Sequence, residues 1–231
     1  MEIISGLHNL RPRHKGCVLT IGNFDGVHRG HQRLIDHLQL QSKSLQLPTM
    51  LMTFEPQPRE FFAGAMLPAR LTRFREKVHL LERTGLDRLL CLPFNEQTSQ
   101  IPAEWFAEEF LTELVGARYV VIGDDFRFGH ERQGDFQLLQ NTGARLGYEV
   151  ISVDTVLQAG DRVSSTLVRS TLSAGNFSKA AELLGHEYFI MGRVVYGRQL
   201  GRQLGVPTAN LKLQRYRAAL EGVYCVTVVG V

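Results

Sequence analysis

Apolar residues recur along most of the chain with two different spacings. Short runs rich in β-branched and other apolar residues indicate buried strands, and between them apolar positions recur three or four residues apart, as on one face of a helix. The predicted strands are 17–22, 49–54, 88–92, 118–123 and 148–153. The predicted helices are 30–45, 72–84, 102–115 and 134–146. Strands that alternate with helices predict an α/β fold with a mainly parallel sheet covered on both faces.

The pattern changes after residue 185. Residues 165–184 predict two short helices, the second of which ends at Gly185. The stretches that follow are strand-like at 188–196, glycine-rich at 197–205, weakly helical at 214–220 and strand-like at 222–231. We therefore predict one domain at 1–185 and the beginning of an all-β module at 186–231. Because the chain ends inside an apolar run, we expect this module to be incomplete.

Composition and charge narrow the class of protein. Of the 231 residues, 44% are hydrophobic and 21% are charged, which is enough apolar material for a packed core. The net charge of +3 is spread along the chain, which suits small anionic substrates and gives no reason to expect nucleic acid. Three distant cysteines, no leader-like start and no long apolar run predict a cytoplasmic protein without membrane contact. The sequence leaves self-association open.

The most informative segment is GNFDGVHRGH at residues 22–31, between a predicted strand and a predicted helix. It lacks the Gly-Lys-Ser/Thr of a P-loop, and its glycines have the wrong spacing for a dinucleotide fingerprint. His28 and His31 lie three residues apart at the helix start, where free N–H groups and the helix dipole favour an anion. Imidazole N–H donors at this place stabilise charge that develops on phosphate oxygens. We therefore predict a nucleotide site with these two histidines as its catalytic residues.

Two further segments are expected to lie near the histidine segment in the fold. The loop 123–134 follows a predicted strand and so lies at the same edge of the sheet. Its Phe126 and Phe128 suit stacking on a flat ring, although ordinary loop packing explains either one alone. The hydroxyls of 164–166 precede a predicted helix, and Arg169 follows them. Helix capping explains one hydroxyl, whereas three hydroxyls and an arginine favour a phosphate site.

Several of these segments, in order, resemble the bacterial bifunctional riboflavin kinase/FMN adenylyltransferase family of the nucleotidyltransferase superfamily. Residues 22–31 resemble its His-x-Gly-His signature, 53–58 its Thr-Phe-x-Pro-His-Pro turn, 123–129 its flavin-side loop and 164–169 its second nucleotide-binding motif. The resemblance implies a Rossmann-like nucleotidyltransferase domain followed by a β-barrel kinase domain. It implies that ATP is bound by Gly22, Phe24, Asp25, Gly26, Gly30, Ser164, Ser165, Thr166 and Arg169. It implies that the flavin is bound by Asp124, Asp125, Phe126, Arg127 and Phe128.

The chain departs from the family pattern at two of these motifs. Gln57 stands where many members carry histidine, so we assign no titrating chemistry to that turn. Leu167 replaces an arginine that is common in the second motif, which leaves Arg169 as the main charge there. Neither departure touches the two histidines.

Residues 192–210 resemble the opening of the riboflavin kinase domain. The resemblance implies an ATP loop at Gly192, Gly197, Gly201 and Gly205, and Mg²⁺ ligands at Thr208 and Asn210 in a Pro-Thr-Ala-Asn motif. Read without the resemblance, this stretch is a glycine-rich turn. The family's general-base glutamate lies beyond residue 231, and Glu221 does not replace it. We therefore expect this chain to lack riboflavin kinase activity.

The resemblance implies that the chain takes part in FAD biosynthesis. The implied reaction is transfer of AMP from ATP to FMN, with Mg²⁺ on the ATP oxygens, and the complete protein would also phosphorylate riboflavin. Two alternatives stay open from the residues alone. One is adenylyl or cytidylyl transfer to another phosphate acceptor, such as nicotinate mononucleotide or phosphopantetheine. The other is a non-catalytic flavin-binding module. The two histidines favour an enzyme, and the loop 123–134 favours a flavin acceptor.

Overall fold

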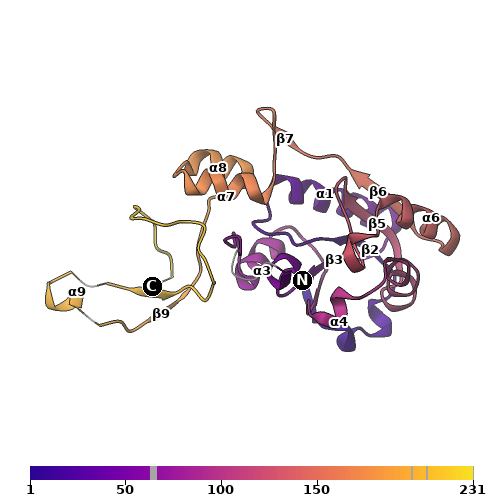
Figure 1. The fold of residues 1–231 in the computed structure, drawn as a ribbon, viewed down its shortest axis with the longest axis horizontal. Coiled ribbons are helices and arrows are strands. Elements are labelled where there is room, and N and C mark those ends of the chain that lie inside the picture. The colour runs from indigo at the N-terminus through magenta and orange to yellow at the C-terminus, as the bar shows by residue number, and fades with distance from the viewer. Residues whose placement is uncertain (63–66, 199, 207, 231) are drawn as a thin grey trace.

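Six parallel strands form the sheet around which most of the chain folds (Figure 1). The computed structural model describes residues 1–62, 67–198, 200–206 and 208–230. In the sheet the strands follow the order β1-β4-β3-β2-β5-β6, and each neighbouring pair is parallel. Their bounds are β1 Glu2–Ser5, β2 Cys17–Ile21, β3 Thr49–Phe54, β4 Arg88–Leu92, β5 Ala117–Gly123 and β6 Glu149–Val153. The chain leaves β2 towards β3 and later returns to the other side of β2 as β5, and such a switch point is where open α/β sheets bind ligands.

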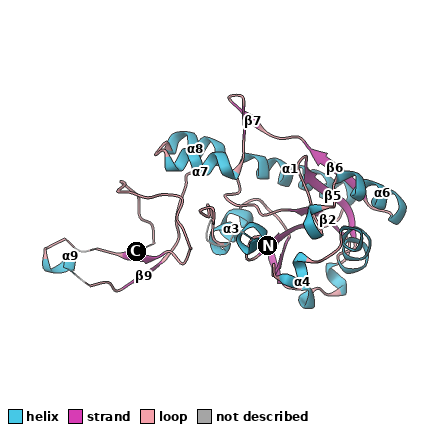
Figure 2. Cartoon of the chain, in the orientation of Figure 1, coloured by secondary structure: helices cyan, strands magenta, loops and turns pink. Residues whose placement is uncertain are grey.

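Helices cover both faces of this sheet (Figure 2). Alternate strand residues point to opposite faces, so Leu19 and Val120 join one core while Val18 and Val121 join the other. The first core packs against η3 and α6, and the second packs against α1 and α3. The longer helices are α1 Arg29–Leu45, α3 Phe74–Glu82, η3 Phe106–Leu114, α6 Phe136–Leu146, α7 Ser165–Ser173 and α8 Phe177–Leu184. The α/β fold predicted from the sequence is confirmed.

Short elements complete this part of the chain. The two-stranded hairpin β7–β8 (Leu157–Gln158 and Asp161–Arg162) precedes α7 and is not evident from the apolar pattern. β1 was also not predicted, because only Ile4 of its four residues is buried. The remaining short helices are η1 Leu7–Asn9, η2 Pro12–His14, α2 Pro58–Phe62, α4 Glu96–Ser99, α5 Ala103–Trp105 and η4 His130–Arg132.

The predicted helix at 102–115 has a different winding. It begins as α5 and continues as η3, a π-helix in which the Val115 amide donates to the Phe110 carbonyl five residues back. The rings of Phe106 and Phe110 stack, with centroids 4.8 Å apart. π-helical winding is rare, and a 3.6-residue period in the sequence does not reveal it.

The segment after α8 has less regular structure than the sequence predicts (Figure 2). Of the predicted strand 188–196 only β9 (Arg193–Val195) forms, paired with β10 (Asn210–Lys212), and α9 (Leu200–Gln203) lies between them. The weak helix at 214–220 is wrong, since these residues form a bridge and bends instead. The strand at 222–231 is wrong for 222–230, because no described strand lies beside it to share hydrogen bonds. Residues 199, 207 and 231 of these predictions lie outside the described residues.

This C-terminal segment extends away from the sheet (Figure 1) and is anchored to helix α3. Arg215 forms an ion pair of 2.5 Å with Glu76 of α3, and both side chains are 1% exposed. The Met191 amide also donates to Glu76, at 2.8 Å. The domain boundary at residues 185/186 stays a prediction. None of the described helices has the length and apolar character needed to cross a membrane.

Candidate active site

The loop between β2 and α1 carries the two predicted histidines. His28 is the N-cap of α1, and its Nδ1 accepts the backbone N–H of His31 at 3.4 Å. The imidazole rings of His28 and His31 stack with 3.6 Å between centroids and 18° between planes. The Phe24 ring lies 4.8 Å from that of His31 and supports it. The two imidazoles are therefore held together at the first turn of α1.

The backbone of this loop is shaped to hold them. Gly30 leaves room for the His28 ring, because a Cβ at that position would lie 3.1 Å from His28 Cε1. Phe24 and Val27 adopt the left-handed region, with φ of 49° and 43°. A β-branched residue such as Val27 rarely adopts it, and strain of this kind, about 1–3 kcal/mol a residue, is typical of functional sites. The side-chain Nε2 of Gln32 donates to the Val27 carbonyl at 2.9 Å and holds the strained conformation.

Burial keeps both imidazoles neutral near pH 7. Desolvation lowers the pKa of His28 to about 4; Asp25 opposes this effect, and the positive charge of Arg169 adds to it. Desolvation also lowers the pKa of His31, with smaller effects from His28 and Lys77. Because Nδ1 of neutral His28 accepts a hydrogen bond, its proton lies on Nε2. Nδ1 of His31 is buried and has no hydrogen-bond partner within the described residues.

Asp25 connects three parts of the chain. Its carboxylate is buried and accepts from the backbone amides of Leu71 and Thr72, at 3.2 and 2.9 Å. It also pairs with Arg169 of α7 at 2.5 Å. The Ser165 hydroxyl donates to the Asp25 carbonyl at 2.9 Å. Asp25 thus fixes the histidine loop against the segment before α3 and against the start of α7.

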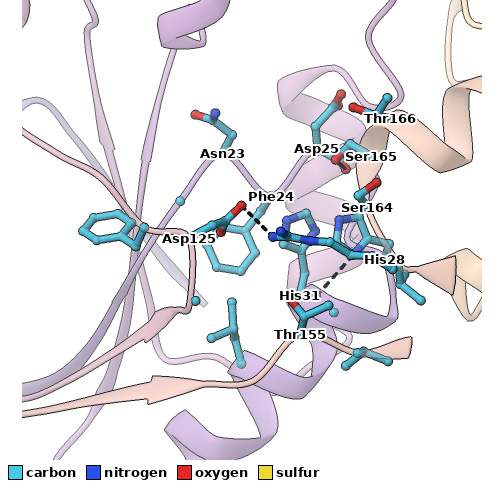
Figure 3. Close-up of a pocket in the computed structure, with 18 of the residues that line it drawn as sticks. Asn23, Phe24, Asp25, His28, His31, Asp125, Thr155, Ser164, Ser165 and Thr166 are labelled. Atoms are coloured by element: carbon cyan, nitrogen blue, oxygen red, sulfur yellow. Dashed lines mark hydrogen bonds and ion pairs between the residues drawn. The ribbon is translucent and has the colours of Figure 1, made fainter. Parts of the chain in front are cut away.

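The predicted phosphate hydroxyls lie at the start of α7. Ser164 is its N-cap and accepts the Leu167 amide at 3.2 Å, whereas Ser165 bonds the histidine loop. Thr166 and Arg169 line the same cavity as the histidines. Figure 3 shows Ser164, Ser165 and Thr166 on a different element from His28 and His31. Two of the three hydroxyls therefore make structural contacts, and Arg169 donates from Nε to the Ala69 carbonyl and from Nη2 to Asp25, each at 2.5 Å.

The loop after β5 lies on the other side of this cavity. Its Asp125 pairs with Arg162 of the β7–β8 hairpin at 2.6 Å, an interaction drawn in Figure 3. Asp124 accepts from the Thr155 hydroxyl at 2.7 Å. Sequence analysis missed Arg162 and Thr155, because nothing in their local pattern shows that they meet this loop.

Two cavities meet at this edge of the sheet. The first, of about 280 Å³, is lined by polar side chains that include both histidines and the hydroxyls of α7. The second, of about 1440 Å³, is lined mainly by apolar and aromatic side chains. The aromatic lining consists of Phe54, Phe62, Phe74, Phe94, Phe106, Phe110, Phe126 and Phe128. Both cavities share one wall, made by Ile21, Gly22, Asn23, Arg59, Asp125 and Phe126.

Most of the predicted site residues are brought to these two cavities. Of the residues predicted for ATP, all except Gly26 line the polar cavity. Gly26 packs against Leu71 and Leu184 instead, where a Cβ would lie 2.8 Å from Leu71 Cδ1. Of the residues predicted for the flavin, Asp124 lines only the polar cavity, and Arg127 and Phe128 line only the aromatic one. The stacked rings of Phe126 and Phe128 have centroids 5.6 Å apart.

The residues predicted for the kinase ATP loop lie together in the C-terminal segment. A Cβ on Gly197 would lie 3.4 Å from Asn210 Oδ1, and a Cβ on Gly201 would lie 3.1 Å from Thr208 Oγ1. Gly192 lies beside Leu211, and Gly205 adopts a positive φ of 75°. The two predicted Mg²⁺ ligands are thus each next to one of the predicted loop glycines.

Two known protein families match most of the chain. The family model for FAD synthetase matches residues 10–167, and that for riboflavin kinase matches residues 184–230. The bifunctional riboflavin kinase/FMN adenylyltransferase of Escherichia coli K12 is 47% identical over 231 residues, which is 100% of this chain and 74% of that protein. The protein of the same name from Pseudomonas fluorescens is 48% identical over 228 residues, 99% of this chain and 73% of that protein.

Among solved structures, the chain resembles a macrolide-efflux protein from Streptococcus pneumoniae. The TM-score is 0.76 at 30% identity, covering 93% of this chain and 70% of that one. The match therefore extends over nearly all of the chain. The family matches, and the extent to which the chain covers its relatives, show that it belongs to the bifunctional riboflavin kinase/FMN adenylyltransferase family.

Proposed function

We propose that this chain transfers AMP from ATP to FMN, producing FAD and pyrophosphate. The observation that carries the proposal is the shared wall between a polar cavity and a larger aromatic cavity. A triphosphate suits the first cavity, and the flat isoalloxazine ring suits the second. With both substrates bound, the FMN phosphate lies at the wall, next to the α-phosphorus of ATP.

The chain's own residues position the substrates and stabilise charge. An oxygen of the FMN phosphate attacks the α-phosphorus in line, and the bond from that phosphorus to the bridging oxygen of pyrophosphate breaks. No enzyme nucleophile is needed. His28 donates from Nε2 and His31 lies stacked on it, so neutral N–H groups meet the phosphate oxygens as charge develops. Thr166 and Arg169, which line the polar cavity, are our candidates to hold the outer phosphates of ATP.

The donor groups present fit Mg²⁺ that arrives with ATP. No group of three His, Cys, Asp or Glu side chains forms a metal site in the part of the chain that the structure describes. Proteins commonly hold Mg²⁺ through substrate phosphates and one or two oxygen ligands, and Asp154 lines the polar cavity. When bound, the ion would neutralise phosphate charge. Thr208 and Asn210 supply hard oxygen ligands for the corresponding ion of the kinase segment.

The second activity of the family, phosphorylation of riboflavin, is proposed for the protein that carries the whole kinase domain. ATP, FMN and riboflavin are the proposed partners, and the cytoplasm is the proposed compartment. Transfer to a different phosphate acceptor and flavin binding without catalysis are the competing functions. The aromatic lining of the larger cavity favours a flavin over nicotinate mononucleotide or phosphopantetheine.

A pyrophosphate-release assay tests the proposed function. The chain is incubated with Mg²⁺, ATP and one of FMN, nicotinate mononucleotide or phosphopantetheine. We expect pyrophosphate and FAD in equal amounts with FMN, and background release with the other two acceptors. Release with another acceptor would favour a different transferase, whereas flavin binding without any release would favour the non-catalytic module.

A further inference from the structure

The turn after β3 presents a buried amide that has no partner. Gln57 is 5% exposed and lines the polar cavity, and its Nε2 forms no hydrogen bond among the described residues. A buried N–H donor without an acceptor is destabilising, because its hydrogen bond to water is lost and not replaced. Such a group in a cavity wall is accounted for when a bound ligand supplies the acceptor.

The backbone of this turn is firmly held. The Gln57 amide N–H donates to Glu60 Oε2 at 2.9 Å. Arg70 pairs with both acids of the turn, at 2.7 Å to Glu55 and 2.5 Å to Glu60. The backbone of the turn that carries Gln57 is therefore held by this ion-pair network, which is one way to preorganise a binding group.

A cation lies two residues further on. Arg59 is exposed and lines both the polar and the aromatic cavity, so it is part of their shared wall. The acids nearest to it in the sequence, Glu55 and Glu60, are paired with Arg70. Arg59 therefore belongs to the wall at which an anion can meet both cavities at once.

We propose that Gln57 and Arg59 bind the phosphate monoester of the flavin acceptor and so select FMN over unphosphorylated riboflavin. The inference rests on the proposed function. A phosphate provides the oxygen acceptors that Gln57 Nε2 lacks, and an arginine fork binds phosphate with charge-assisted hydrogen bonds. The position of Arg59 favours the acceptor phosphate over the ATP phosphates. The acceptor phosphate joins the ring in the aromatic cavity to the ATP in the polar cavity, whereas the outer ATP phosphates lie in the polar cavity alone.

Flavin titrations test this assignment. Fluorescence quenching gives the dissociation constants of FMN and riboflavin for wild type, Arg59→Gln and Gln57→Leu, with thermal melting as the check on folding. We expect Arg59→Gln to weaken FMN binding roughly tenfold and Gln57→Leu roughly three- to tenfold. Riboflavin binding should stay within about twofold of wild type, since riboflavin lacks the phosphate. Gln57→His, which restores a donor, should recover part of the loss.

Arg33→Gln is the matched control. Arg33 is exposed on α1 and lines neither cavity, so this variant removes the same charge without touching the wall. The proposal is overturned if the ratio of FMN to riboflavin affinity in Arg59→Gln and Gln57→Leu equals that of Arg33→Gln. It is also overturned if ATP binding, measured separately, weakens in place of FMN binding. If wild type binds FMN but makes no FAD, the proposed function fails while the affinity ratio still decides the phosphate site.

Discussion

The proposed donor role of the two histidines depends on where their rings lie. His28 caps α1 through Nδ1, which leaves Nε2 as the protonated nitrogen, and it stacks on His31 at 3.6 Å. A second positive charge at this spacing would be repelled by the first and by Arg169. Burial and this repulsion together keep the pair uncharged. In the proposed function, the site therefore binds phosphate through neutral hydrogen-bond donors and does not depend on the imidazolium form.

The low pKa of His28 predicts a specific pH dependence. The folded protein has a His28 pKa of about 4, below the ordinary value of 6.5, so the unfolded chain binds more protons between these pH values. The free energy of unfolding should fall as pH falls from 6.5 towards 4, and His28 should remain neutral through the physiological range. We expect an NMR titration of the His28 ring to give a midpoint near 4. A midpoint at 6.5 or above would contradict this assignment.

A second measurement isolates the contribution of this side chain. Asparagine is a good N-cap but does not titrate, so His28→Asn should lose part of the acid sensitivity seen in urea unfolding between pH 7 and 5. His31 contributes in the same direction, since its pKa is also lowered. An unchanged slope in the variant would assign the acid sensitivity to other groups.

At the scale of elements, the junction of β2 and α1 decides the geometry of the site. Gly30 is helical, and its role is to leave space, since a Cβ there would approach the His28 ring to 3.1 Å. Alanine is favoured over glycine in a helix by about 1 kcal/mol. At this position helix propensity therefore favours alanine, whereas the space needed by the His28 ring favours glycine.

Gly30→Ala should therefore separate activity from stability. We expect the free energy of unfolding to stay within about 1 kcal/mol of wild type, because the gain in helix propensity offsets the contact. FAD formation should fall at least about tenfold as the His28 ring is displaced. Ser44→Ala, an exposed change near the end of α1, serves as the control. Wild-type activity in Gly30→Ala would show that the ring position is not critical.

The sequence revealed those elements whose signal is local. The central strands are buried apolar runs, and the histidine segment was evident from a strand followed by glycines and a helix. The helix at 102–115 was evident from its apolar period but its π winding was not, and the hairpin β7–β8 has no apolar period of its own. The contacts of Asp25 with Thr72 and Arg169 join residues 47 and 144 positions apart, so only the fold shows that this carboxylate has an architectural role. The apolar run at 222–230 gave the wrong element because strand formation depends on a partner strand.

At the scale of the whole molecule, α3 joins the two parts of the chain. Glu76 of α3 is buried with Arg215, and Arg215 also bonds the Arg70 carbonyl at 3.5 Å. Leu71 and Thr72 follow Arg70 in the sequence, and their backbone N–H groups donate to the Asp25 carboxylate of the histidine loop. The ion pair that anchors the C-terminal segment is therefore linked to the candidate active site through residues 70–72.

Arg215→Ala should loosen this anchor. Removing one partner of a buried pair leaves an unpaired charge and costs about 3–5 kcal/mol. We expect faster hydrogen exchange at the Met191 amide, which donates to Glu76, while the amides of β2 and β3 stay protected. Arg217→Ala is the control, because its pair with Glu221 is exposed and 3.7 Å long. Unchanged protection of Met191 in Arg215→Ala would show that the pair does not hold the segment in place.

The most direct test of the account is the rate of FAD formation when each imidazole of the stacked pair is replaced. His28→Asn and His31→Asn are compared with His79→Asn, which alters an exposed histidine of α3. We predict that kcat falls about 10²–10³-fold in the first two variants, with FMN still bound and the fold intact, and that it is unchanged in the third. Near wild-type turnover in both His28→Asn and His31→Asn would contradict the claim that these imidazoles stabilise the transferring phosphate.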